Sequence, residues 1–203
     1  MTRKNLVRTA LAVLTTGLLL AGCGNSDTGA QGHDTGSTTG TTNAAAPDGH
    51  NDADIAFAQG MIPHHQGAIE MAALVQGRTS NAEVLDLASR IEKAQDPEIT
   101  TMTGWLNSWG AQVHTKDMPG MDHGSGMPGM SAADMDMLKQ AKDARFDKIF
   151  LEMMIGHHQG AIDMSNTELE QGSNADAKKL AQQIIDAQQA EITEMQGLVE
   201  AAG

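Results

Sequence analysis

The sequence predicts an all-α protein, a four-helix bundle built from two copies of one helical hairpin. Two observations predict it directly: a long internal repeat, and apolar residues spaced three and four apart inside each copy. The third observation is compositional. The chain has three Phe, two Trp and no Tyr in 203 residues, and no segment alternates apolar with polar residues as a half-buried strand does.

The N-terminal segment 1–22 is predicted to be a lipoprotein signal peptide. Its basic start is followed by an apolar stretch that is too short and too broken by polar residues to span a bilayer permanently. It ends Leu20-Ala21-Gly22-Cys23, which resembles the bacterial lipobox. We therefore expect lipidation of Cys23, a membrane lipid anchor and a place on the extracytoplasmic face of the cell membrane. The alternatives are an ordinary secretion signal with an incidental cysteine, or an N-terminal anchor helix.

Residues 23–51 are predicted to form a disordered tether after the lipidated Cys23, because this segment is rich in Gly, Ser, Thr, Asn and Asp and has almost no large apolar residue. The net charge of −13 argues against nucleic acid as a partner. A single cysteine excludes an intrachain disulfide and a cysteine-based zinc or iron–sulfur centre.

The repeat organises the predicted bundle, residues 52–203. Shifted by 93 residues, His-His-Gln-Gly-Ala-Ile at 64–69 falls on the same six residues at 157–162, and nearly half of positions 57–104 are identical to 150–197. Each copy is predicted to be a hairpin, about 52–114 and 134–201, with a link at 114–133.

Helix boundaries follow from cap residues. In the first hairpin, Ser80 or Asn81 is expected to cap the second helix after a turn at 77–81. In the second, one helix is expected from about 135 to 171, capped by Ser131 or Asp134, and another from 174 to 201.

The repeated motif carries the candidate chemistry. On a helical wheel both histidines of each copy point at or near the bundle interior, and methionines lie three or four residues before them and two turns after. Such spacings let Met61, His64, His65 and Met71 converge on one ion, with Met154, His157, His158 and Met164 as their counterparts. Two half-sites and one shared centre of four histidines both remain possible.

Thioether and imidazole form a soft ligand set that suits Cu(I) or another soft or borderline metal, whereas a di-iron bundle needs carboxylates. The second helix of each hairpin could add ligands from the facing wall, namely Glu98, Met102, Glu191 and Met195. The alternative is structural: methionine often fills cores, and buried histidines can form a polar network between close helices.

The link is rich in methionine, with Met-Pro-Gly-Met twice. Methionine has no packing role in a Gly/Pro loop, so we expect this segment to bind Cu(I) or Ag(I), and His123 to hold Cu(II) as well, unless the methionines serve as an oxidant sink. The candidate ligands are Met118, Met121, His123, Met127 and Met130.

The motif at 64–71 and 157–164, the paired hairpins and the downstream Glu-Ile-Thr-x-Met resemble the domain-of-unknown-function 305 family. The resemblance covers about residues 52–201. It implies a secreted or lipid-anchored bacterial protein of ferritin-like architecture, in a family some of whose members are associated with copper. Carried over by position, it implies His64, His65, Met61, Met71, His157, His158, Met154 and Met164 as metal ligands.

The functional prediction is a lipid-anchored protein that sequesters Cu(I) or passes it to a copper carrier protein. A metal-dependent redox enzyme is the first alternative, but the sequence supplies neither the carboxylate set for iron nor a tyrosine for radical chemistry. A non-metal envelope binding module or a purely structural bundle is the second.

Overall fold

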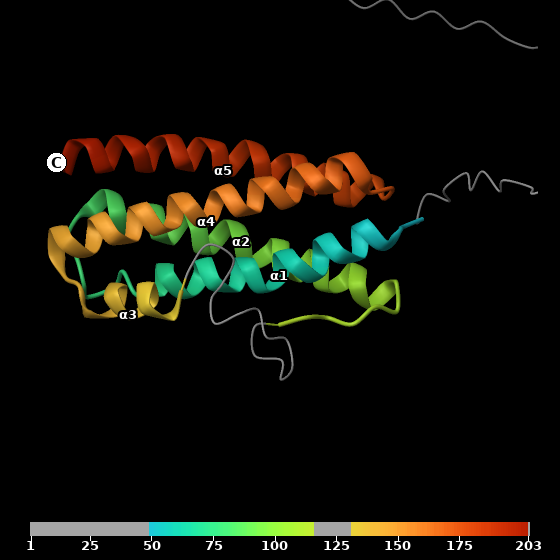
Figure 1. Ribbon diagram of the computed structural model, residues 1–203, viewed down its shortest axis with the longest axis horizontal. Helices are drawn as coiled ribbons and strands as arrows, with labels where there is room; N and C mark the ends of the chain where they lie inside the picture. The colour runs from blue at the N-terminus through green and yellow to red at the C-terminus, as the bar shows by residue number, and fades with distance from the viewer. Residues whose placement is uncertain (1–48, 116–130, 203) are drawn as a thin grey trace, which may run out of the picture. The chain divides into compact units, whose positions relative to one another are not determined.

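The computed structural model describes residues 49–115 and 131–202, and these ranges contain helices and connecting segments but no strand. The helices, shown in Figure 1, are α1 (Asp52–Ala73), α2 (Ala82–Ser108), α3 (Ala132–Gln140), α4 (Asp143–Gln171) and α5 (Ala175–Ala202). The all-α prediction is therefore confirmed.

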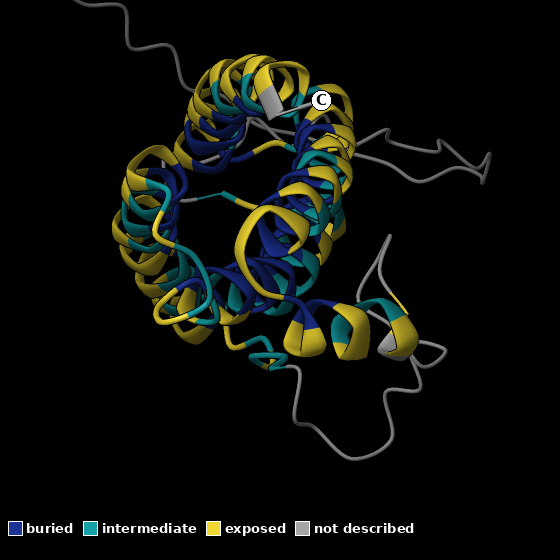
Figure 2. Ribbon diagram, turned by 90° about the vertical axis from the view of Figure 1, so that its left-hand side faces the viewer, coloured by how far each residue is buried: buried dark blue, intermediate teal, exposed yellow. Residues whose placement is uncertain are grey.

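Four long helices form the bundle, with α1 packed along α2, α4 along α5, and α1 against α4. Viewed nearly end-on, their buried faces turn toward a common interior (Figure 2). Two contacts show that α1 and α4 run antiparallel. The Asn51 side chain at the start of α1 donates to the carbonyl of Gln171 at the end of α4, and the Asp143 N–H at the start of α4 donates to the carbonyl of Arg78 just after α1.

The two hairpins are thus related by an approximate twofold axis that passes between α1 and α4. This arrangement brings the repeated motifs, which lie 93 residues apart in sequence, to the same level of the bundle. It also places the start of each hairpin against the turn of the other.

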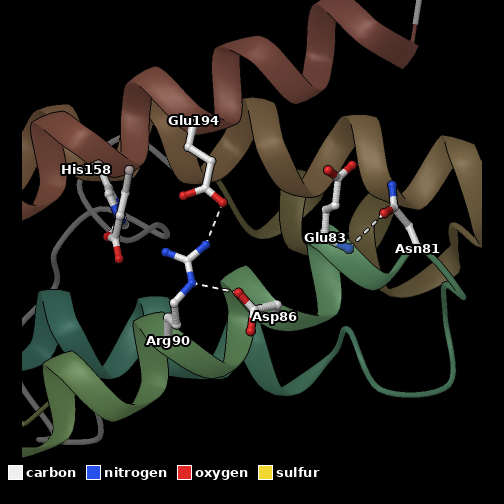
Figure 3. Close-up of polar contacts among 7 residues, drawn as sticks. Asn81, Glu83, Asp86, Arg90, His158 and Glu194 are labelled. Carbon is white, nitrogen blue, oxygen red and sulfur yellow. Dashed lines mark hydrogen bonds and ion pairs between the residues drawn. The ribbon is translucent and has the colours of Figure 1, made fainter. Parts of the chain in front are cut away.

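Capping residues fix four helix starts, and at α5 the side chain of Asn174 accepts from the N–H groups of Asp176 and Ala177. The side chain of Asn51 accepts from the N–H of Asp54 and begins α1, and Ser131 does the same with Asp134 at α3. Asn81, one of the two predicted caps, accepts from the N–H of Glu83 at the start of α2 (Figure 3). Each bond satisfies a helix N–H that has no partner within its own helix.

One helix prediction was wrong. The expected helix over 135–171 is two helices, because the chain leaves the helical conformation at Ala141 and Lys142. The guanidinium of Arg78 donates to the carbonyls of Lys139 and Ala141, and Leu138 is fully buried in the core. The turn after α1 therefore satisfies the carbonyls that a continuous helix would have bonded internally.

The outer helices α2 and α5 are joined at the surface by Arg90. Its guanidinium bonds Asp86 on its own helix at 2.8 Å and Glu194 on α5 at 2.5 Å (Figure 3). These side chains are about 40 to 70 % exposed, so the ion pairs contribute little to stability.

The predicted signal peptide, Cys23 and most of the tether lie outside the described residues. None of the described helices has the length and apolar character needed to cross a membrane.

Candidate metal centre

The centre of the bundle is a pair of histidines from the two copies of the motif. The rings of His64 on α1 and His157 on α4 lie with centroids 3.7 Å apart and planes tilted by 43°. Both side chains are almost completely buried, and neither ring nitrogen of either residue has a hydrogen-bond partner. Two imidazoles therefore lie against each other on the approximate twofold axis, and none of their four nitrogens has a hydrogen bond.

A glycine allows this close approach. A Cβ atom added at Gly160 would lie 3.1 Å from Nε2 of His64, which is tighter than ordinary van der Waals contact. Gly160 follows His157 by three residues, so it lies on the same face of α4.

The second histidine of each motif is held by a carboxylate from the neighbouring helix. Nε2 of His65 donates to Glu98 on α2 at 2.6 Å, and Nε2 of His158 donates to Glu191 on α5 at 2.7 Å. Both histidines are buried, and their Nδ1 atoms have no hydrogen-bond partner.

A carboxylate on one ring nitrogen fixes the tautomer and leaves a lone pair on the other, which is the usual arrangement around a metal-binding histidine. Glu98 and Glu191, whose direction the sequence could not settle, thus turn inward toward the histidines.

Burial keeps the central pair neutral. It lowers the pKa of His64 to about 3, with the nearby His65 and His158 adding to the effect, and it lowers the pKa of His157 well below its ordinary value, together with His64 and His158. At neutral pH both rings therefore carry a free lone pair for a metal. A buried polar atom without a partner costs about 1–3 kcal/mol, so six such nitrogens are unfavourable in a purely structural core.

The bundle interior also holds six methionines predicted from the sequence as candidate ligands. Met61, Met71, Met102, Met154 and Met195 are fully buried, and Met164 is partly buried. They divide between two apolar clusters. Met61 and Met102 belong to one, with Met164 packed against it, and the others belong to the second.

This division corrects one expectation. Met61 and Met71 are separated by about 15 Å along α1 at a rise of about 1.5 Å per residue, and they lie in different clusters. They cannot both bind the ion that was expected to collect all four residues of one copy. Sequence reasoning missed that Met71 and Met164 each lie with the methionines of the other hairpin, because the antiparallel arrangement of α1 and α4 is a tertiary feature.

The remaining predicted ligands, Met118, Met121, His123, Met127 and Met130, lie outside the described residues. Within 49–115 and 131–202, no three side chains drawn from His, Cys, Asp and Glu form a group able to hold a metal ion.

These features define a class: an all-helical bundle of two repeated hairpins with buried histidines on its internal twofold axis and buried methionines in the apolar clusters of its core. The chain belongs to the family described as a domain of unknown function (DUF305), which matches residues 54–199.

Solved structures of relatives share the fold. A DUF305 protein of Streptomyces coelicolor is 34 % identical with a TM-score of 0.67, and the match covers 78 % of this chain and 96 % of that one. A DUF305 fragment from Deinococcus radiodurans is 29 % identical with a TM-score of 0.66, covering 74 % and 97 %.

The protein CopM, in its Cu(I)-bound form, is 31 % identical with a TM-score of 0.61, covering 73 % of this chain and 96 % of CopM. CopM structures with Cu(II) and with Ag also match. No curated protein matches the chain.

Proposed function

We propose that this protein binds copper, preferentially Cu(I), in the histidine–methionine centre of its bundle, and that it holds the ion or passes it to a carrier protein. The observation that carries the proposal is the group of four buried histidines with six unpartnered ring nitrogens, in a bundle interior that also contains buried thioethers. The ligand set is soft, which favours Cu(I) over hard cations.

The relatives support this choice of metal. CopM binds Cu(I), Cu(II) and Ag, and it shares about 30 % of aligned residues and the fold with this chain. Copper fits the donor atoms present here, since neutral imidazole and thioether are both ligands for Cu(I).

We further propose that the protein works on the extracytoplasmic face of the cell membrane, anchored through a lipid on Cys23. The support is the leader-like segment 1–22 and its Leu-Ala-Gly-Cys ending. Conversion of Cys23 to Ser should release the protein from the membrane fraction, and membrane retention of that variant would contradict the lipid anchor.

The test of copper binding is a competitive Cu(I) titration of the full chain under reductant. Replacing both His64 and His157 with Phe should weaken affinity at least a hundredfold, while His114→Ala, in the segment after α2, serves as the control. A variant with Leu at Met118, Met121, Met127 and Met130 separates the link from the bundle. Loss of binding only in the link variant, or no affinity tighter than micromolar in the wild type, would contradict the proposal.

A further inference from the structure

We infer that the bundle holds two separate soft-metal sites, one on each side of the His64–His157 pair, and that each is built from methionines of both hairpins. The inference rests on the proposed copper binding and goes beyond it, because it fixes the number of sites and assigns their ligands. The two methionine groups are defined as group A (Met61, Met102 and Met164) and group B (Met154, Met195 and Met71).

The register of the first hairpin brings Met61 and Met102 together. His65 on α1 contacts Glu98 on α2, and α1 and α2 run antiparallel. Met61 lies four residues before His65, and Met102 lies four residues after Glu98. Since residues four apart lie on one helix face, these two side chains occupy the next level toward the start of α1.

The third sulfur of group A comes from the other hairpin. Sδ of Met164 on α4 lies 3.5 Å from the position of a Cβ atom at Gly60, the residue beside Met61. Met164 also packs against the cluster that contains Met61 and Met102. The thioether of Met164 thus reaches across from α4 and lies against α1 at Gly60.

The second hairpin repeats the arrangement. His158 contacts Glu191, and Met154 and Met195 occupy the corresponding level on α4 and α5. Met71 of α1 belongs to the same cluster, so it is the thioether from the other hairpin. Here the position equivalent to Gly60 is Met153, which is partly buried against this cluster and offers a fourth sulfur.

The two groups cannot share one ion. Met61 precedes His64 by three residues on α1 and Met154 precedes His157 by three on α4, and the two helices are antiparallel. The groups therefore lie on opposite sides of the histidine pair along the bundle axis. Each bound ion would link the two hairpins, because its ligands come from both.

The sites should differ in affinity. Group B together with Met153 offers four thioethers. Group A offers three, because the position equivalent to Met153 is Gly60. Additional soft donors favour a soft ion, so the first equivalent should occupy group B.

The experiment is a titration of the full chain with Ag(I), a soft ion without redox chemistry under these conditions, followed by NMR of methyl-labelled methionine. Leucine at the four link methionines removes competing ligands, and Met137→Leu, at the 48 % exposed position on α3, is the control. Two equivalents should bind, with the signals of Met154 and Met195 shifting before those of Met61 and Met102. Met61→Leu with Met102→Leu should remove one equivalent, and Met154→Leu with Met195→Leu the other.

The decisive variant is Met164→Leu. It should lower the Ag(I) affinity of group A at least tenfold and leave the affinity of group B unchanged, although Met164 and Met154 lie on the same helix. A single equivalent with all six methyl signals moving together, or an effect of Met164→Leu confined to group B, would overturn the inference while leaving copper binding intact. Absence of any binding in the bundle would instead contradict the proposed function.

Discussion

The hydrogen bonds from His65 to Glu98 and from His158 to Glu191 bear directly on the chemistry of single residues. Each carboxylate is only 14–19 % exposed and lies between its buried histidine and solvent. It holds the Nε2 proton and so directs the Nδ1 lone pair inward. This is a positioning role, since the carboxylates need not touch the metal themselves.

Conversion of Glu98 and Glu191 to Gln should therefore lower Cu(I) affinity about 10–100-fold, the usual effect of losing the residue that orients a metal-binding histidine. Competitive titration measures it, with the exposed Glu170→Gln as control. An unchanged affinity in the double variant would show that the orientation of His65 and His158 does not matter for binding.

Glu168 provides a second effect at this scale. It is 1 % exposed beside Asp54, which already accepts hydrogen bonds from the N–H groups of Asn51, Ser173 and Asn174. Burial, with Asp54 adjacent and despite the opposing Lys178, raises the pKa of Glu168 to about 8. The pKa of Asp54 is lowered: burial opposes this, but the neighbouring Glu168 and the hydrogen bonds from the N–H groups of Asn174, Asn51 and Ser173 outweigh it.

The sign of the pH effect follows. Since the folded pKa of Glu168 exceeds its unfolded value of 4.5, its contribution to stability is fully present below about pH 4.5 and is lost as pH rises toward 8. The loss is on the order of a few kcal/mol. Glu168→Gln should flatten the dependence of unfolding free energy on pH in that range, as measured by denaturant titration of the metal-free protein. Equal slopes in both proteins would contradict this.

At the scale of elements, two glycines of α4 show what limits the distance between α1 and α4. Gly160 lies against His64, whereas Gly156, one turn earlier on α4, has nothing within 4 Å of an added Cβ. The two positions form a matched pair on one helix.

Gly156→Ala should stabilise the protein by about 1 kcal/mol, the difference in helix propensity between the two residues. Gly160→Ala should gain nothing in stability and should lower Cu(I) affinity about tenfold or more, because His64 is packed against His157 and has little room to retreat. Thermal unfolding and metal titration of both variants measure this, and equal gains in stability would show that the contact with His64 is not tight.

The start of a helix could be predicted from the sequence where residues close to it in the chain determine it. Asn81 and Ser131 cap helices as predicted, because capping depends on a side chain and the next few N–H groups. The break between α3 and α4 was not predictable, since it depends on Arg78 reaching the carbonyls of Lys139 and Ala141 from 61 and 63 residues away in sequence.

At the scale of the whole molecule, the repeat allowed the bundle and the inward direction of all four motif histidines to be predicted. The repeat did not show how the two copies face each other. The antiparallel contact of α1 with α4 determines that His64 meets His157. It also places Met71 and Met164 each in the apolar cluster that holds methionines of the other hairpin. These pairings are properties of tertiary packing, and no spacing within one copy contains them.

The most direct test of the central claim is X-ray absorption at the copper edge of the Cu(I)-loaded full chain with leucine at the four link methionines. We predict a first coordination shell of sulfur with nitrogen, and a smaller nitrogen contribution when His64 and His157 are both replaced by Phe. A shell of oxygen and nitrogen without sulfur, or a spectrum that the histidine replacements leave unchanged, would contradict a histidine–methionine copper centre in this bundle.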